Sequence, residues 1–238
     1  MNNRISFFEC IDGEKGITYE ECNRFWESGD SKVHSDTSDG LMKELADHIE
    51  KRMELNDNDV LLVIGGGGGY IDRFLTSRVN ILIGIDFSQQ KTDAAKKRNP
   101  GAVYYKQDFL DSYEYLKEYS INKIYSYSVM QYCKPEDFDR FIQKQINVLD
   151  LSKKCLIGHL DVPDVDKAYY YYDIYCNDVT EDIIDKNRDK IRFLIGDGSC
   201  WHDMKKITQS LSKMEMVKKI DILDAHYWKF RSDIVIEL

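Results

Sequence analysis

Residues 60–73 constrain the fold of this 238-residue chain more than any other stretch. Val60–Ile64 is a short apolar run that ends at glycine, which is typical of a buried strand. Five consecutive glycines, residues 65–69, allow positive φ angles and a close approach of the backbone to a ligand. A helical pattern begins at Tyr70, so the N–H groups of a helix start face the loop. Strand, glycine loop and helix in this order predict the opening of a nucleotide-binding βαβ unit.

The glycine spacing excludes the common dinucleotide and phosphate loops. A nicotinamide or flavin site requires G-x-G-x-x-G or a final alanine, and in every register the last position falls within residues 70–72, Tyr-Ile-Asp. No Gly-Lys-Ser/Thr follows, as the phosphate loop would require. The chain instead contains G-x-G-x-G, formed by Gly65, Gly67 and Gly69.

Acidic residues follow the next two predicted strands. Ile81–Ser88 is apolar and carries Asp86 near its end, where an acid can accept both hydroxyls of an adenosine ribose and would repel the 2′-phosphate of NADP. Ala102–Tyr105 is the third predicted strand, and it leads to Asp108 and Phe109. The carboxylate of Asp108 can accept the adenine amino group, while the ring of Phe109 can lie on the adenine.

With these residues the chain resembles the class I S-adenosylmethionine-dependent methyltransferases. The resemblance covers residues 55–162 well and the C-terminal third loosely, and it includes the predicted fourth strand with its tail, Lys123–Tyr132. It implies S-adenosylmethionine as the cofactor. The residues that it implies as cofactor contacts are Gly65, Gly66, Gly67, Gly69, Asp86, Phe87, Gln107, Asp108, Phe109, Ser126 and Ser128.

One position departs from the family pattern. The family has an acid two residues before the first glycine, and this chain has Val63 there. Because that acid commonly helps to hold the amino group of the cofactor, either another residue does so here or cofactor binding is weaker. An inactive or repurposed methyltransferase fold is the alternative interpretation.

The alternation of strands and helices predicts an α/β fold with a Rossmann-like, seven-stranded, mainly parallel sheet and helices on both faces. The last two predicted strands, Met216–Leu223 and Trp228–Leu238, give an antiparallel closure of the sheet. The predicted parts of this single domain are an N-terminal helical cap (1–40), a cofactor-binding core (41–162), an acceptor-side insert after the fifth strand (163–201) and the closure of the sheet (202–238).

Composition excludes several classes of partner. The net charge of −9 argues against a nucleic-acid substrate, because phosphate backbones are bound by Lys/Arg surfaces. No apolar run reaches the length of a membrane span, and the N-terminus lacks the plan of a signal peptide. The six cysteines are scattered without a C-x-x-C pair, so we expect reduced thiols, a cytoplasmic location and no metal site.

The predicted insert contains four consecutive tyrosines, Tyr169–Tyr172, followed by Tyr175. Consecutive residues cannot share one face of a helix, so some of these rings must leave the core. Tyrosine rings suit a sugar or a planar acceptor, because they offer flat apolar surface and a hydroxyl. A lid that packs on its neighbours and the interface of a homodimer are the alternatives.

Three residues are candidates for a general base. A hydroxyl acceptor benefits from a base, whereas an amine needs only to be unprotonated. His202 is the first candidate, since we expect it to open a helix, whose N-terminus disfavours a positive imidazolium. His159 and Asp161 are the next candidates, because residues two apart on the fifth strand are expected to share a face. Either histidine could instead be structural.

A second resemblance is less specific. Segments 123–132, 158–164, 196–202 and 227–233 resemble methyltransferases of bacterial surface-polysaccharide and sugar modification. This implies a small acceptor, either a sugar, a sugar nucleotide or a phosphorylated precursor of a capsule or lipopolysaccharide. A small-molecule N-methyltransferase and a non-catalytic partner protein on the same fold remain alternatives.

Overall fold

A computed structural model describes residues 38–192 and 199–238 of the chain. The cap predicted over residues 1–40, with its helix Thr18–Glu27, therefore lies outside the described residues except at its last three positions. The start of the loop 196–202 lies outside them as well. The predicted division of the chain into four parts stays a prediction.

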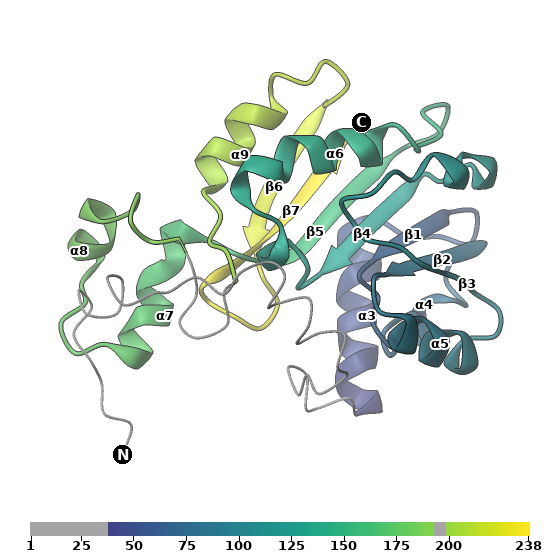
Figure 1. Ribbon diagram of the computed structural model, residues 1–238, viewed down its shortest axis with the longest axis horizontal. Helices are drawn as coiled ribbons and strands as arrows, with labels where there is room; N and C mark the ends of the chain where they lie inside the picture. Colours follow the sequence, from purple (N-terminus) through teal and green to yellow (C-terminus); the bar gives the residue numbers. More distant parts are fainter. Residues whose placement is uncertain (1–37, 193–198) are drawn as a thin grey trace.

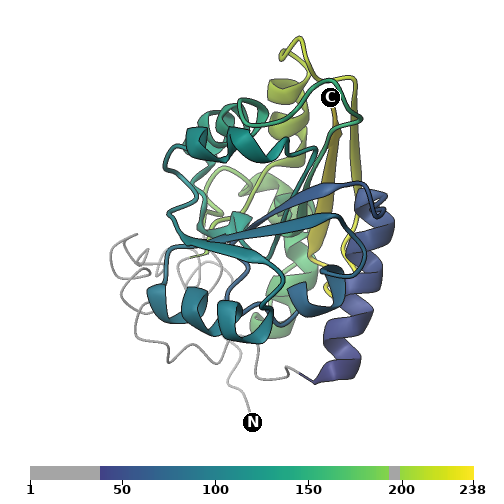
Figure 2. The same ribbon diagram turned by 90° about the vertical axis from the view of Figure 1, so that its right-hand side faces the viewer.

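A seven-stranded sheet forms the centre of the described part, in the order β3-β2-β1-β4-β5-β7-β6 (Figure 1). Neighbours among the first five strands pair in parallel, while β7 is antiparallel to both β5 and β6. The strands are β1 (Val60–Ile64), β2 (Ile81–Asp86), β3 (Val103–Lys106), β4 (Lys123–Tyr127), β5 (Leu156–Pro163), β6 (Lys219–Asp224) and β7 (Arg231–Glu237). Figure 2 shows how strongly the strands at the two ends of the sheet are rotated relative to each other. The predicted fold class is confirmed.

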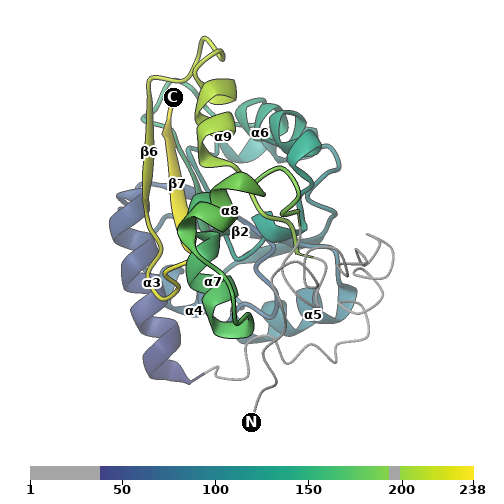
Figure 3. The ribbon, with the colours of Figure 1, turned by 90° about the vertical axis from the view of Figure 1, so that its left-hand side faces the viewer.

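Two layers of helices cover the sheet. Apolar residues of α3 (Asp39–Met53), α4 (Asp72–Leu75) and α5 (Gln89–Arg98) pack on one face. Those of α6 (Phe138–Ile146) and α9 (Met204–Leu211) pack on the other. Two further helices of the insert, α7 (Ala168–Tyr175) and α8 (Glu181–Lys186), extend beyond the sheet on the side where β1 to β5 end (Figures 1 and 3).

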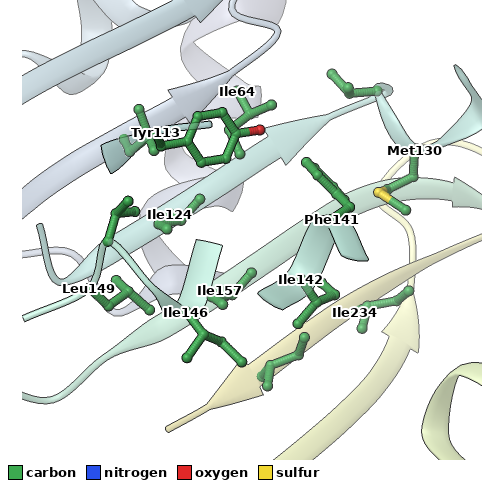
Figure 4. Close-up of a cluster of buried hydrophobic side chains, with 14 of the residues drawn as sticks. Ile64, Tyr113, Ile124, Met130, Phe141, Ile142, Ile146, Leu149, Ile157 and Ile234 are labelled. Carbon is green, nitrogen blue, oxygen red and sulfur yellow. The ribbon is translucent and has the colours of Figure 1, made fainter. Parts of the chain in front are cut away.

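The core on the α6 face is the larger of the two. Buried apolar residues recur along α6 at Phe138, Phe141, Ile142 and Ile146, and Ile157 of β5 and Ile234 of β7 belong to the same core (Figure 4). This spacing of three and four residues produces one continuous apolar stripe along the helix. The stripe holds α6 in place, so that the turn before it sits above the end of β4.

Three predicted helices differ from the observed ones. The helix expected from Tyr70 is a single turn, Asp72–Leu75, because the weak helix formers Thr76 and Ser77 follow it. The segment expected as a helix over 111–119 forms a 3₁₀ helix at Glu114–Tyr119. The helix expected to open at His202 begins two residues later, since the Asp203 carboxylate accepts the backbone N–H groups of residues 205 and 206 as an N-cap.

The described ranges contain no helix that is long and apolar enough to cross a membrane. The longest of these helices, α3, has 15 residues and a charged outer side. Cys133, Cys155, Cys176 and Cys200 are free thiols, and all four are buried. The other two cysteines lie outside the described residues.

We expect Phe141→Ala to destabilise the protein by about 3–5 kcal/mol, because the substitution opens a cavity between α6 and the sheet. Phe141 has no exposed surface. Denaturant unfolding measures the effect, with Leu151→Ala as the control, since Leu151 is 46% exposed. Equal midpoints for the two variants would contradict the placement of α6.

Candidate active site

The glycine loop after β1 needs glycine at three of its five positions. Gly65, Gly67 and Gly69 have φ angles of 68°, 57° and 68°, the left-handed region that side chains rarely adopt. A Cβ on Gly65 would also lie 2.5 Å from Cγ2 of Val129. The backbone N–H of Gly65 donates to the Ile85 carbonyl over 2.8 Å, which holds the loop against the end of β2. The G-x-G-x-G pattern of the sequence therefore coincides with the left-handed positions.

Asp86 faces the loop from the end of β2. Its Oδ2 accepts the N–H of Gly67 over 2.9 Å, and its Oδ1 accepts the N–H of Ser88 over 2.9 Å. Burial raises the pKa of Asp86, while the backbone donors act in the opposite direction. Each oxygen keeps a lone pair, so both can accept a ribose hydroxyl. Apart from its two chain neighbours, no atom of residues 38–192 and 199–238 lies within 4 Å of a Cβ placed on Gly67, which leaves room for a cofactor beside this carboxylate.

The residues after β3 lie next to those after β2, since Asp86 pairs with Lys106 in the parallel register. Oδ1 of Asp108 accepts the N–H of Leu110 over 2.8 Å, which fixes the turn. The ring of Phe109 contacts the edge of Phe141 at 5.3 Å between centroids. Half-buried side chains continue this edge at Phe87 and Gln107.

The two serines of β4 occupy different environments. Ser126 has no exposed surface, and its Oγ lies 2.8 Å from Nδ1 of His159 inside the core. Ser128 lies at the tip of the strand with a φ of 54°, where its hydroxyl donates to Oδ2 of Asp161. Of this pair, only Ser128 lies at the edge beside the glycine loop; Ser126 supports that edge from within.

Asp161 lies at an irregularity of β5. The register against β7 shifts between His159 and Val162, and Asp161 has a φ of 62°. The expectation that His159 and Asp161 share a face was therefore wrong, because the bulge interrupts the alternation of side chains between the two faces of β5. His159 contacts the ring of Phe141, and Val162 packs in the same core as that ring, so Val162 and not Asp161 shares the face of His159. Left-handed non-glycine residues cost about 1–3 kcal/mol each and cluster at functional sites.

A network of charges holds Asp161. Nη1 of Arg231 donates to Oδ2 of Asp161 over 3.1 Å and to Oε1 of Gln131 over 2.6 Å. The N–H of Asp161 donates to Oδ1 of Asp233, whose Oδ2 receives Nε of Arg52 over 3.0 Å. These contacts connect β5, β7 and α3 at the end of the sheet. Sequence reasoning gave Arg231 no role at the site, because a single arginine at the start of a strand does not by itself indicate a function.

His159 and His202 are both buried and neutral. Burial lowers the pKa of His159 to about 3 and that of His202 to about 4. The expectation that His202 stays neutral is confirmed, but burial is the cause, since α9 begins only at Met204. Nε2 of His202 lies 2.8 Å from the carbonyl oxygen of Met130, an acceptor, so this nitrogen carries the proton.

The tyrosines of α7 diverge as expected. Tyr171 and Tyr172 are buried in a separate core with Trp201. Tyr170 and Tyr175 are 47% and 41% exposed. Figure 3 shows α7 and α8 on the side where the parallel strands end. No group of three or more potential metal ligands lies close together within the described ranges.

Comparison with known proteins agrees with this geometry. Residues 62–157 match the family model of a methyltransferase domain. The search of curated proteins found no match.

Solved methyltransferases share the fold at low identity. One is the magnesium protoporphyrin IX methyltransferase of Synechocystis PCC 6803 with bound S-adenosylhomocysteine, with 12% identity and a TM-score of 0.51 over 97% of this chain and 90% of that one. Another is phosphoethanolamine N-methyltransferase 1 of Haemonchus contortus with phosphoethanolamine and S-adenosylhomocysteine, with 12% identity and a TM-score of 0.59 over 93% of this chain and 50% of that one. At such identities the likeness concerns the fold alone.

The strand order and the glycine loop with its facing acid agree with the match of residues 62–157 to a methyltransferase domain, and together they support a class I S-adenosylmethionine-dependent methyltransferase. S-Adenosylmethionine is accordingly its cofactor. This cofactor agrees with the first resemblance drawn from the sequence. The acceptor and the methylated atom are proposed below.

We expect Gly67→Ala to weaken binding of S-adenosylhomocysteine at least tenfold while the protein stays folded. The added methyl would enter the space beside Asp86, where the described part of the chain leaves 4 Å clear, and it would strain the left-handed φ of 57°. Gly101→Ala is the matched control, since its Cβ also has no neighbour within 4 Å. Calorimetric titration gives the affinities, and equal affinities in the two variants would contradict the role of the loop.

We expect Asp86→Ala to lose about 1.5–3 kcal/mol of binding free energy for S-adenosylhomocysteine, about ten- to a hundredfold in affinity. The reason is the loss of a charged acceptor for the ribose hydroxyls. The same titration measures it, and an unchanged dissociation constant would remove Asp86 from the site.

Proposed function

We propose that this protein transfers the methyl group of S-adenosylmethionine to a hydroxyl of a small acceptor. The acceptor class that we favour is a sugar, a sugar nucleotide or a phosphorylated precursor of a bacterial capsule or lipopolysaccharide. The observation that carries the proposal is the edge of the sheet, where the left-handed glycines, Asp86 and the bonded pair Ser128–Asp161 follow neighbouring strands. In a parallel sheet, ligands bind outside the carboxyl ends of the strands, near the point where strand order reverses.

The cofactor half of the proposed site lies on β1, β2 and β3. Asp86 binds the ribose, Asp108 accepts the adenine amino group and Phe109 lies against the adenine ring. The cofactor supplies an electrophilic methyl group, so the tasks of the chain are to align the acceptor in line with it and to keep water out. The glycine loop serves the first task by allowing a close approach of the backbone.

The acceptor half of the proposed site lies between the ends of β4 and β5 and the insert. The exposed rings of Tyr170 and Tyr175 offer flat apolar surface with hydroxyls, which suits the face of a sugar. The net charge of −9 disfavours a nucleic acid. The four free thiols of the described residues fit the reducing cytoplasm, where we place the reaction.

Of the three candidate bases, we favour Asp161. Its carboxylate lies at the strand end, where it accepts from the Ser128 hydroxyl and from Nη1 of Arg231, and an ionised carboxylate can accept a proton. All three candidates are buried, but Nδ1 of His159 is engaged with the Ser126 hydroxyl and Nε2 of His202 with a backbone carbonyl. We infer that these two histidines support the edge from inside.

An amine acceptor is the second candidate. The solved phosphoethanolamine N-methyltransferase has the same fold, so this fold can hold an acceptor that is a small phosphorylated amine. An amine requires no base, so this candidate also fits the burial of both histidines. A non-catalytic partner protein is the third reading, and titration with S-adenosylhomocysteine separates it, since such a protein need not bind the cofactor at millimolar concentration.

We expect Asp161→Asn to lower turnover roughly 10²–10⁴-fold while the affinity for S-adenosylhomocysteine stays unchanged. Mass spectrometry first identifies an acceptor, by the gain of one methyl group in a set of sugars, sugar nucleotides and phosphorylated amines. The matched variants are His159→Gln and His202→Gln, for which we expect smaller losses. Wild-type turnover in Asp161→Asn would mean that the base lies elsewhere or that the acceptor is an amine.

A further inference from the structure

A buried carboxylate lies beneath the glycine loop and takes no part in the contacts described above. Asp72 opens α4 and is only 1% exposed. A Cβ placed on Gly66 would lie 3.1 Å from Oδ2 of Asp72 and 3.1 Å from Cγ1 of Val63. The Asp72 side chain therefore packs directly against the loop, beside Val63 of β1.

Hydrogen bonds lead from this carboxylate back to the loop. The hydroxyl of Tyr104 donates to Oδ2 of Asp72 over 2.9 Å, and that of Tyr125 donates to Oδ1 over 3.3 Å. Nδ2 of Asn99 donates to the Tyr104 hydroxyl over 2.9 Å and to the carbonyl oxygen of Gly69 over 2.9 Å. The chain of contacts thus runs from Asp72 through Tyr104 and Asn99 to the last glycine of the loop.

The charge of Asp72 sets the direction of these bonds. An ionised carboxylate can only accept, so Tyr104 must donate to it, and the lone pairs of the same hydroxyl are then free to accept from Asn99. One amide hydrogen of Asn99 is donated to the Tyr104 hydroxyl, so the other can be donated to the carbonyl oxygen of Gly69. A neutral amide in place of Asp72 could donate to Tyr104 and reverse this order.

The buried charge of Asp72 destabilises the folded protein at neutral pH. Burial raises its pKa to about 6, against the effect of the two tyrosine hydroxyls, and the charge of Asp86 raises it further. A raised carboxyl pKa means that the folded state holds the proton more tightly than the unfolded state. The contribution of Asp72 to stability is therefore most favourable below about pH 4 and is lost as the pH rises to about 6. A buried group that weakens the fold at neutral pH calls for a role in function.

We propose that Asp72 is a positioning residue for the cofactor, which holds the glycine loop in its binding shape through Tyr104 and Asn99. The proposal rests on the role of the loop in holding S-adenosylmethionine, and Gly67→Ala tests that role separately. Strong loss of binding in Gly67→Ala together with wild-type binding in the variants below would refute only the role of Asp72.

The first experiment compares Asp72→Asn with the wild type at pH 7.5, by thermal melting and by titration with S-adenosylhomocysteine. We expect the melting temperature to be equal or higher, since the buried charge is gone, and the dissociation constant to rise about tenfold. A structural role alone would lower the melting temperature and leave binding at a temperature well below it unchanged. Wild-type affinity in a folded Asp72→Asn protein overturns the proposal.

The second experiment does not depend on the folding of that variant. Tyr104→Phe removes one hydroxyl from the chain, and Tyr105→Phe is the matched control on the same strand, since the Tyr105 hydroxyl bonds only to Tyr119 among the described hydrogen bonds. We expect about tenfold weaker binding of S-adenosylhomocysteine for Tyr104→Phe and an unchanged affinity for the control. If Asp72→Asn folds, the double variant should bind no more weakly than the weaker single variant, because both break one chain. Wild-type binding by Tyr104→Phe, or fold-losses that multiply in the double variant, would overturn the proposal.

Discussion

The parallel pairing of β1 between β2 and β4 is the constraint on which the site depends. This register places the ends of the three strands at one edge, so that the glycine loop, Asp86 and Ser128 come together although they are far apart in the chain. One bond shows the result, since the N–H of Gly67 reaches Oδ2 of Asp86 over 2.9 Å. The two layers of helices bury both faces of these strands and leave that edge as the place where a ligand can meet the backbone.

The buried polar groups near this edge fall into two classes that differ in their bonding partners. His159, His202 and Ser126 lie inside the core, where desolvation keeps the histidines neutral and their bonds tie β4 to β5 and to the turn after β4. Asp161 keeps its partners in a charged network that reaches α3 and β7. A neutral histidine can be enclosed at moderate cost, whereas the buried carboxylate of Asp161 is paired with Arg231.

Several residues at the edge of the sheet have conformations or burial that destabilise the folded state. Ser128 and Asp161 take left-handed conformations without being glycine, and each is bonded to the other. Asp72 is buried with a raised pKa directly below the loop. Favourable packing elsewhere, such as the apolar stripe of α6, offsets the unfavourable free energy of these residues. Such a distribution is expected where the shape of a site matters more than its stability.

The sequence by itself determined the order of strands and helices, the positions of the left-handed glycines and the place of Asp86 at the end of the second strand. Hydrophobic periodicity and glycine spacing are local properties of the chain. It also indicated that the four tyrosines could not share one face. Only the tertiary structure decided that Ser126 and His202 are enclosed, that a bulge turns Asp161 away from the face of His159, and that Asp72 lies beneath the loop beside Val63. Burial, register shifts and long-range hydrogen bonds arise from contacts between residues distant in the chain, and no local pattern encodes them.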